Sequence, residues 1–148
     1  MIDARTQALL QDLLRRASRS MLQYVGEAYP WTPDTNTDLL SKVRAVIDEE
    51  EGAVEGLATF LRRKRIPIGY LGSYPQNFTI LNFVSLDYLM PRLLDWQRKW
   101  TAVLDRDSAL IADPEAKGEV AKLVAVAHSH LGELEKLTAT PAKAGAHY

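Results

Sequence analysis

Residues 37–65 read TDLLSKVRAVIDEEEGAVEGLATFLRRKR, and this stretch decides the fold. Its apolar residues recur at intervals of three and four, which is the spacing of one face of an α-helix. Thr37 is a good N-cap, and the basic run at the other end complements the negative pole of the helix dipole. We therefore predict a helix from about Asp38 to Arg65. Its core-facing stripe consists of Leu40, Val43, Ile47, Glu50, Val54, Leu57 and Leu61.

The same periodicity predicts three further helices, over about residues 3–28, from residue 81 or 85 to residue 104, and over about 114–137. Asp113 followed by Pro114 is a start signal for the last of them, because proline fits the first turn of a helix. Pro91 lies inside the third, where we expect a kink. The sequence thus predicts an all-α, four-helix bundle over residues 1–138, followed by a disordered tail at residues 139–148.

The composition limits the class of protein. The 148 residues suit one domain, and the formal net charge of -1 gives no electrostatic reason to expect nucleic acid or an anionic membrane as a partner. The chain contains no cysteine, which excludes disulfides and thiolate-bound metal. No apolar run approaches the roughly 18 residues of a membrane-spanning helix. We expect a cytoplasmic protein.

The longest connection, between the second and third helices, is rich in aromatic residues. Residues 67–79 read PIGYLGSYPQNFT, and we expect Tyr70, Tyr74 and Phe78 to pack on the bundle. About 13 extended residues can span roughly 43 to 47 Å, so the connection is long enough to cross the bundle from end to end. Both an up-down bundle and a bundle with this crossover remain open.

Glu50 interrupts the apolar stripe of the second helix. A charged group on a buried stripe is costly unless it is paired, hydrogen-bonded or bound to metal. One interpretation is an ion pair with an arginine of the first helix, for which Arg15, Arg16 and Arg19 are available.

A second interpretation is a metal site. His130 and Glu133 are three residues apart and share a face of the last helix. Asp87 comes level with Glu133 if the last two helices fold back near Leu110, and in the crossover bundle Glu50 lies at a similar depth. The candidate metal ligands are therefore Glu50, Asp87, His130 and Glu133, and these donors suit iron, manganese or zinc. Each of them also has a structural explanation, as a satisfied core residue or a solvated one.

Four long helices with a crossover between the second and third resemble the ferritin-like superfamily. Its di-iron members carry a Glu on two helices and Glu-x-x-His on the other two. The nearest match in this chain is reversed, as His130-x-x-Glu133. The resemblance therefore implies a degenerate or metal-free member.

Two classes of function follow. The favoured one is a metal-free helical bundle without a cofactor, an interaction or stress-associated protein whose buried ion pairs are structural. The alternative is a ferritin-like protein that binds iron, manganese or zinc. Trp96 and Trp100 share a helix face that could serve as the contact of a homodimer. The sequence assigns no catalytic residue, because it offers no recognisable nucleophile–base–acid set and no glycine-rich phosphate loop.

Overall fold

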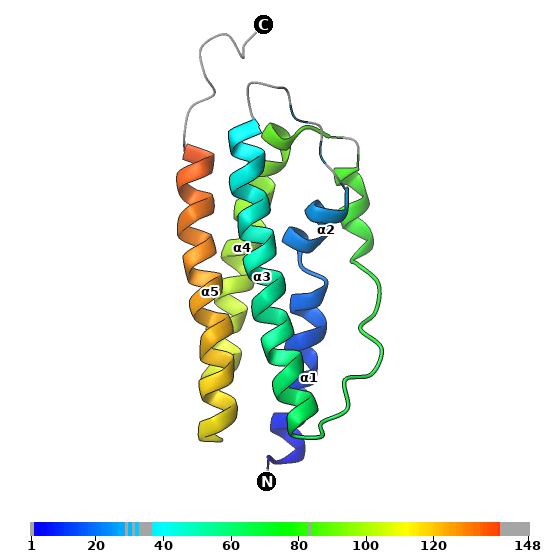
Figure 1. Cartoon of the computed structure of the whole chain (residues 1–148), viewed down its shortest axis with the longest axis vertical. Helices are drawn as coiled ribbons and strands as arrows, with labels where there is room; N and C mark the ends of the chain where they lie inside the picture. Colours follow the sequence, from blue (N-terminus) through cyan, green and yellow to red (C-terminus); the bar gives the residue numbers. More distant parts are fainter. Residues whose placement is uncertain (1, 29, 31, 33–36, 83, 140–148) are drawn as a thin grey trace, which may run out of the picture.

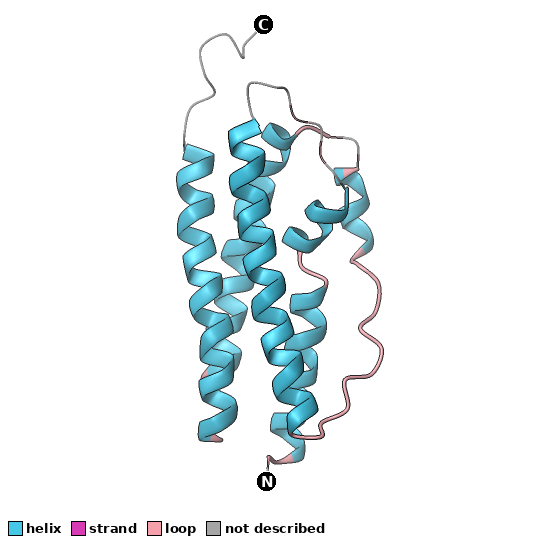
Figure 2. Ribbon diagram, in the orientation of Figure 1, coloured by secondary structure: helices cyan, strands magenta, loops and turns pink. Residues whose placement is uncertain are grey.

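The computed structural model describes residues 2–28, 30, 32, 37–82 and 84–139, and every regular element within these ranges is helical (Figure 2). The all-α prediction is therefore confirmed. The elements are α1 (Ala4–Ser18), α2 (Met21–Ala28), α3 (Thr37–Arg63), the short 3₁₀ helix η2 (Gln76–Leu81), α4 (Leu86–Ser108) and α5 (Pro114–Ala139). None of the described helices is long and apolar enough to cross a membrane.

The helices form an elongated bundle with a crossover (Figure 1). α1 and α2 run away from the N-terminal end of the bundle, and α3 runs back. The connection after α3 then returns along the outside of the bundle to η2, so α4 runs parallel to α3, and α5 is antiparallel to both. α5 packs against α3 and α4, while α3 also packs against α1 and α2. Of the two topologies that the sequence left open, this is the crossover.

The first predicted helix, residues 3–28, is interrupted, so the prediction of one continuous helix was wrong. The chain leaves the helical conformation at Arg19 and Ser20 and resumes it at Met21. Ser20 caps the new helix, because its Oγ accepts a hydrogen bond from the backbone N–H of Gln23 at 3.2 Å. A Ser-x-x-Gln spacing is a signature of a helix start, and here it divides the segment into α1 and α2.

α3 ends two residues before the predicted end, in a left-handed turn. The Ile66 N–H donates to the Leu61 carbonyl at 2.9 Å, and the Arg65 N–H donates to the Arg62 carbonyl at 3.0 Å. This pair of bonds is the Schellman motif, which requires a left-handed residue that is usually glycine. Here Arg65 takes that place, with a φ of 59°.

Arg65→Gly should raise the free energy of unfolding by about 0.5 to 1 kcal/mol, because the left-handed conformation costs a residue with a Cβ about 1 kcal/mol or more. Urea denaturation followed by circular dichroism measures the change. Arg63→Gly, in the last helical turn, is the control and should lower stability by a similar amount. A loss of stability in Arg65→Gly would contradict the left-handed turn.

α4 and α5 begin where side chains cap them. Ser85 Oγ accepts a hydrogen bond from the Tyr88 N–H at 3.2 Å, and Asp113 Oδ2 accepts one from the Ala116 N–H at 2.8 Å. The predicted start of the last helix is thus confirmed. α4 continues through Pro91 as far as Ser108. The predicted tail begins at residue 139, which is still helical, and residues 140–148 lie outside the described residues.

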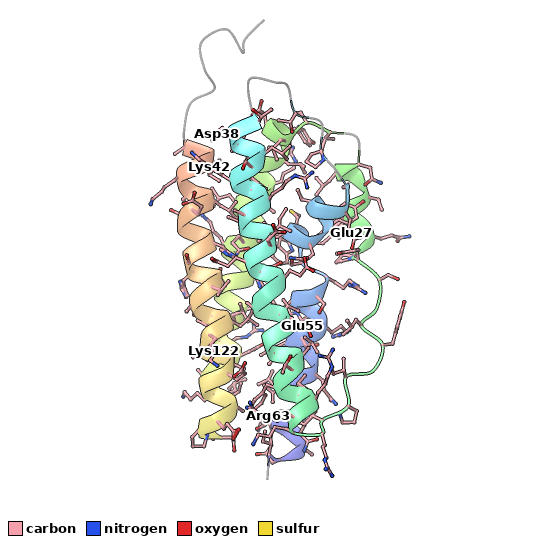
Figure 3. The ribbon with its side chains drawn as sticks, viewed as in Figure 1. Glu27, Asp38, Lys42, Glu55, Arg63 and Lys122 are labelled. Carbon is pink, nitrogen blue, oxygen red and sulfur yellow. The ribbon has the colours of Figure 1, made fainter. Side chains whose placement is uncertain are left out.

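The connection between α3 and η2 is fastened to the bundle by three side chains. Gln11 Nε2 donates to the Pro67 carbonyl at 2.7 Å, Arg19 Nε donates to the Gly72 carbonyl at 2.7 Å, and the Tyr74 hydroxyl donates to Glu27 Oε1 at 3.0 Å. Glu27 lies on the side of α2 that faces the connection (Figure 3). The crossover is therefore held along its length and does not hang freely in solvent.

The aromatic residues of the connection were predicted to pack on the bundle, which is correct for two of the three. Phe78 is 2% exposed and Tyr74 is half-buried, but Tyr70 is 84% exposed. Tyr24 of α2 lies against both of the packed rings, with centroids 5.2 Å from Tyr74 and 5.6 Å from Phe78. Tyr70 lies between the fastening points and contributes its ring to the surface.

The core consists of two apolar clusters stacked along the bundle. The lower cluster of Figure 1 joins α1, the end of α3, the end of α4 and the start of α5. The upper cluster joins α2, the start of α3, η2, the start of α4 and the end of α5. Between the two clusters, α3, α4 and α5 each bury one polar residue, and the junction of α1 and α2 buries Ser20. This middle layer consists of Ser20, Glu50, Gln97 and His130.

Candidate functional site

The middle layer lies at one level of the bundle. On each helix its residue stands between residues of the lower cluster and residues of the upper cluster, for example Glu50 between Ile47 and Leu57 on α3. The four side chains are between 0% and 3% exposed. Buried polar groups are costly unless they are satisfied, so four of them at one level of the core mark this level as the candidate functional site.

Glu50 is bound by a hydroxyl and an amide. Its Oε1 accepts a hydrogen bond from Ser20 Oγ at 2.5 Å and another from Gln23 Nε2 at 3.0 Å. The Gln23 amide also donates to the Ile47 carbonyl at 3.1 Å, which fixes the orientation of the amide. The predicted burial of Glu50 is therefore confirmed, while its partners come from the junction of α1 and α2.

Ser20 serves two functions with one hydroxyl. The oxygen accepts the Gln23 N–H as the cap of α2, and the hydroxyl hydrogen goes to Glu50. The interruption between α1 and α2 thus supplies both donors of the Glu50 site, since Ser20 and Gln23 both belong to the start of α2. The Ser-x-x-Gln spacing could have located these partners in the sequence.

Burial raises the pKa of the Glu50 carboxyl from 4.5 to about 7, because the low-dielectric interior disfavours its charged form. The hydrogen bonds from Ser20 and Gln23 stabilise the carboxylate and oppose this change, but they are the weaker effect. Near neutral pH the site therefore holds comparable amounts of carboxylic acid and carboxylate.

The predicted ion pair between Glu50 and an arginine is wrong. Arg16 lies between Asp12 and Asp107, at 3.7 and 4.0 Å, and Arg19 donates to the Gly72 carbonyl. The sequence-based estimate assumed a single first helix, and the interruption at Ser20 changes which residues of that segment face α3.

His130 of α5 contacts α3 through Glu49, the residue before Glu50. Its Nε2 lies 2.8 Å from Glu49 Oε1, and the side chain of Glu49 is 61% exposed. A carboxylate can only accept a hydrogen bond, so in the neutral imidazole Nε2 carries the proton and Nδ1 has the lone pair. His130 Nδ1 is buried and has no hydrogen-bond partner among the described residues.

Gln97 completes the layer from α4. Its Nε2 donates to the Ala127 carbonyl of α5 at 3.1 Å, while its Oε1 is a second buried atom without a hydrogen-bond partner among the described residues. Gln97 therefore joins α4 to α5 across the layer. Sequence reasoning missed it, although it interrupts an apolar stripe in the same way as Glu50.

The four predicted metal ligands are not brought together. Glu50 binds Ser20 and Gln23, whereas His130 and Glu133 line a separate surface depression of about 250 Å³ beside Glu49. Asp87 is exposed in the first turn of α4. In the part of the chain that the structure describes, no group of three or more His, Cys, Asp or Glu side chains is placed to hold a metal ion. The reason is rotation: consecutive residues of a helix differ by about 100°, so Glu49 and Glu50 face different neighbours.

The face of Trp96 and Trp100, which the sequence suggested as a homodimer contact, packs largely against other residues of the same chain. Trp100 is 4% exposed in the lower cluster, and Trp96 is half-buried against it, with ring centroids 5.8 Å apart. His128, by contrast, is exposed, and its Nε2 lies 2.8 Å from Asp105 Oδ1.

No protein-family model, no curated protein and no solved structure matches this chain.

Proposed function

We propose that this chain is a ferritin-like bundle without a metal centre, which acts by binding a partner and not by redox chemistry. The composition of the middle layer carries this proposal. A di-iron site of that superfamily needs carboxylates from all four helices and two histidines. The middle layer offers one carboxyl, one imidazole, one hydroxyl and one amide.

Part of the layer is already bonded within the protein. Ser20 and Gln23 both donate to Glu50 Oε1, and His130 Nε2 lies 2.8 Å from Glu49 Oε1. His130 Nδ1 and Gln97 Oε1 have no hydrogen-bond partner among the described residues. A carboxyl with a pKa of about 7 is also a poor ligand near neutral pH, since a metal must first displace its proton. The layer thus functions as a hydrogen-bonded junction between the two apolar clusters.

The topology supports the ferritin-like part of the proposal. The parallel α3 and α4, with a connection that crosses the whole bundle, reproduce the arrangement that the resemblance implies (Figure 1). The superfamily builds its metal site in the bundle core from side chains of facing helices, and the buried middle layer is a polar part of the core in this bundle.

The experiment that tests the proposal is metal analysis combined with thermal unfolding. Purified protein should contain far less than one equivalent of iron, manganese or zinc. Its melting temperature should change by less than about 1 °C when each ion is added in excess, because only a ligand that binds the folded state raises it.

His130→Ala and His128→Ala are the matched pair for the alternative function. A metal-induced rise in melting temperature that His130→Ala abolishes and His128→Ala retains would contradict the proposal. It would instead favour a metal site in the depression lined by Glu49, His130 and Glu133.

A further inference from the structure

A groove of about 540 Å³ lies between α1 and α4, beneath the crossover connection. Its volume is within the range of small-molecule sites, about 300 to 1,000 Å³. None of the residues that line it belongs to α3, to α5 or to the middle layer. We call it the cationic groove. Its basic lining residues are Arg15, Arg16, Arg19 and Lys99.

The floor of the cationic groove is aromatic. Trp96 and Trp100 stack at an interplanar angle of 29°, and the Phe78 ring meets Trp96 edge-on with centroids 6.4 Å apart. Phe78 and Trp100 are almost fully buried, whereas Trp96 remains half-buried at the groove. The floor therefore offers a rigid apolar surface next to open space.

The rim of the cationic groove is positive. Four cations line it, and no acidic residue does so among the residues that the structure describes. Arg19 donates hydrogen bonds to the carbonyls of Gly72 and Ser18. These acceptors are neutral, so the bonds do not cancel the positive charge of Arg19. Arg15 pairs with Asp12, and Lys99 lies 3.0 Å from Asp95, but neither aspartate lines the groove.

A neighbouring pocket shows the opposite character. It has a volume of about 340 Å³ and lies on the α3 side of Arg19 and Tyr74. Its charged lining residues are four carboxylates and two arginines, namely Glu27, Asp48, Glu51, Glu55, Arg19 and Arg44. Among the described residues, the lining of the cationic groove contains four cations and no carboxylate, so it attracts an anion more strongly than this pocket does.

We propose that the cationic groove binds a small organic anion with an apolar, planar body. The acidic group of the ligand pairs with Arg15, Arg19 and Lys99, and the planar body lies on Trp96 beneath the connection. This site is separate from the middle layer, so the proposal stands or falls independently of the metal test.

The test uses 8-anilinonaphthalene-1-sulfonate, an aromatic monoanion, and calorimetric titration of the folded chain. We expect saturable binding with one site. The uncharged parent N-phenyl-1-naphthylamine should bind at least about tenfold more weakly, because it lacks the group that meets the cations. Sodium phosphate at the same concentration and ionic strength should not displace the probe, because it has no apolar body.

The variant Arg15→Gln/Lys99→Gln removes two exposed charges from the rim and should weaken binding of the anionic probe about tenfold. Arg62→Gln/Lys122→Gln is the matched control. Arg62 and Lys122 are 59% and 76% exposed, against 55% and 76% for Arg15 and Lys99, and each forms a comparable ion pair. Lys122 lies on α5, away from the residues that line the groove (Figure 3).

Any one of five results would overturn the proposal. Three concern the ligands: no saturable binding of the probe, equal binding of the neutral parent, or displacement of the probe by phosphate. Two concern the variants: a loss of affinity in the control variant as large as that in Arg15→Gln/Lys99→Gln, or full affinity in Arg15→Gln/Lys99→Gln. Circular dichroism of both variants should match the wild-type spectrum, since all four side chains lie on the surface.

Discussion

Glu50→Gln should stabilise the protein at pH 8 by about 2 to 3 kcal/mol. The folded state holds the Glu50 proton with a pKa of about 7, against 4.5 for the ordinary carboxyl. Above pH 7 the folded wild-type protein must bury a charged carboxylate. For a pKa difference of this size, this lowers its free energy of unfolding by about 3 kcal/mol. Glutamine is uncharged and keeps an Oε1 that can accept the hydrogen bonds of Ser20 and Gln23.

The direction of the pH dependence follows from proton binding. Between pH 4.5 and 7 the folded state binds more protons at Glu50 than the unfolded state does, so the contribution of Glu50 to stability falls as the pH rises. Urea denaturation at pH 5 and pH 8 measures it. The stability difference between Glu50→Gln and wild type should be small at pH 5 and large at pH 8.

Glu51→Gln is the control, because Glu51 is the next carboxylate along α3 and is exposed. It should change stability by less than about 0.5 kcal/mol at either pH. If both variants show the same dependence on pH, the buried carboxyl is not the cause.

Phe78→Ala should lower the free energy of unfolding by about 3 kcal/mol or more. The Phe78 ring is 2% exposed and lies against Tyr24, Tyr74 and Trp96, so its removal leaves a cavity where the connection meets the bundle. Chemical denaturation gives the magnitude. Tyr70→Ala is the control in the same connection, and it should have an effect near zero, because Tyr70 is 84% exposed. Similar losses for both variants would mean that the connection packs differently.

Most of the helical architecture could be predicted from the sequence, because its signals are local. The apolar spacing located α3, and Asp113 with Pro114 located the start of α5 to the residue. The interruption at Ser20 was missed because the apolar stripe continues across it. The Ser-x-x-Gln cap signal was present, but it was weaker than the periodicity.

The topology and the partners of the buried residues could not be predicted, because they are not local. A connection of the observed length fits either topology, and only the tertiary packing selects the crossover. The burial of Glu50 followed from its position on the apolar stripe of its helix. The partners of Glu50 and His130 depend on the rotation of each helix, which placed the start of α2 beside Glu50 and Glu49 beside His130.

The exposure of Tyr70 shows the same limit within the connection. An aromatic residue in a crossover gains stability if its ring is buried. An irregular backbone, however, lacks the regular spacing of a helix or strand, so the sequence does not show which side the ring faces. Gly69 and Gly72 on either side adopt positive φ values of 69° and 83°, a conformation that residues with a Cβ rarely adopt. The direction of the Tyr70 side chain depends on this irregular backbone.

The most direct test of the central claim, that the middle layer holds a buried, hydrogen-bonded carboxyl without a metal, is a ¹³C NMR titration of the Glu50 carboxyl. The account predicts a midpoint at a pH of about 7 that does not change when zinc is added. A midpoint near 4.5, or a midpoint that falls sharply with zinc, would contradict it. The first result would mean that Glu50 is solvated, and the second that the layer is a metal site.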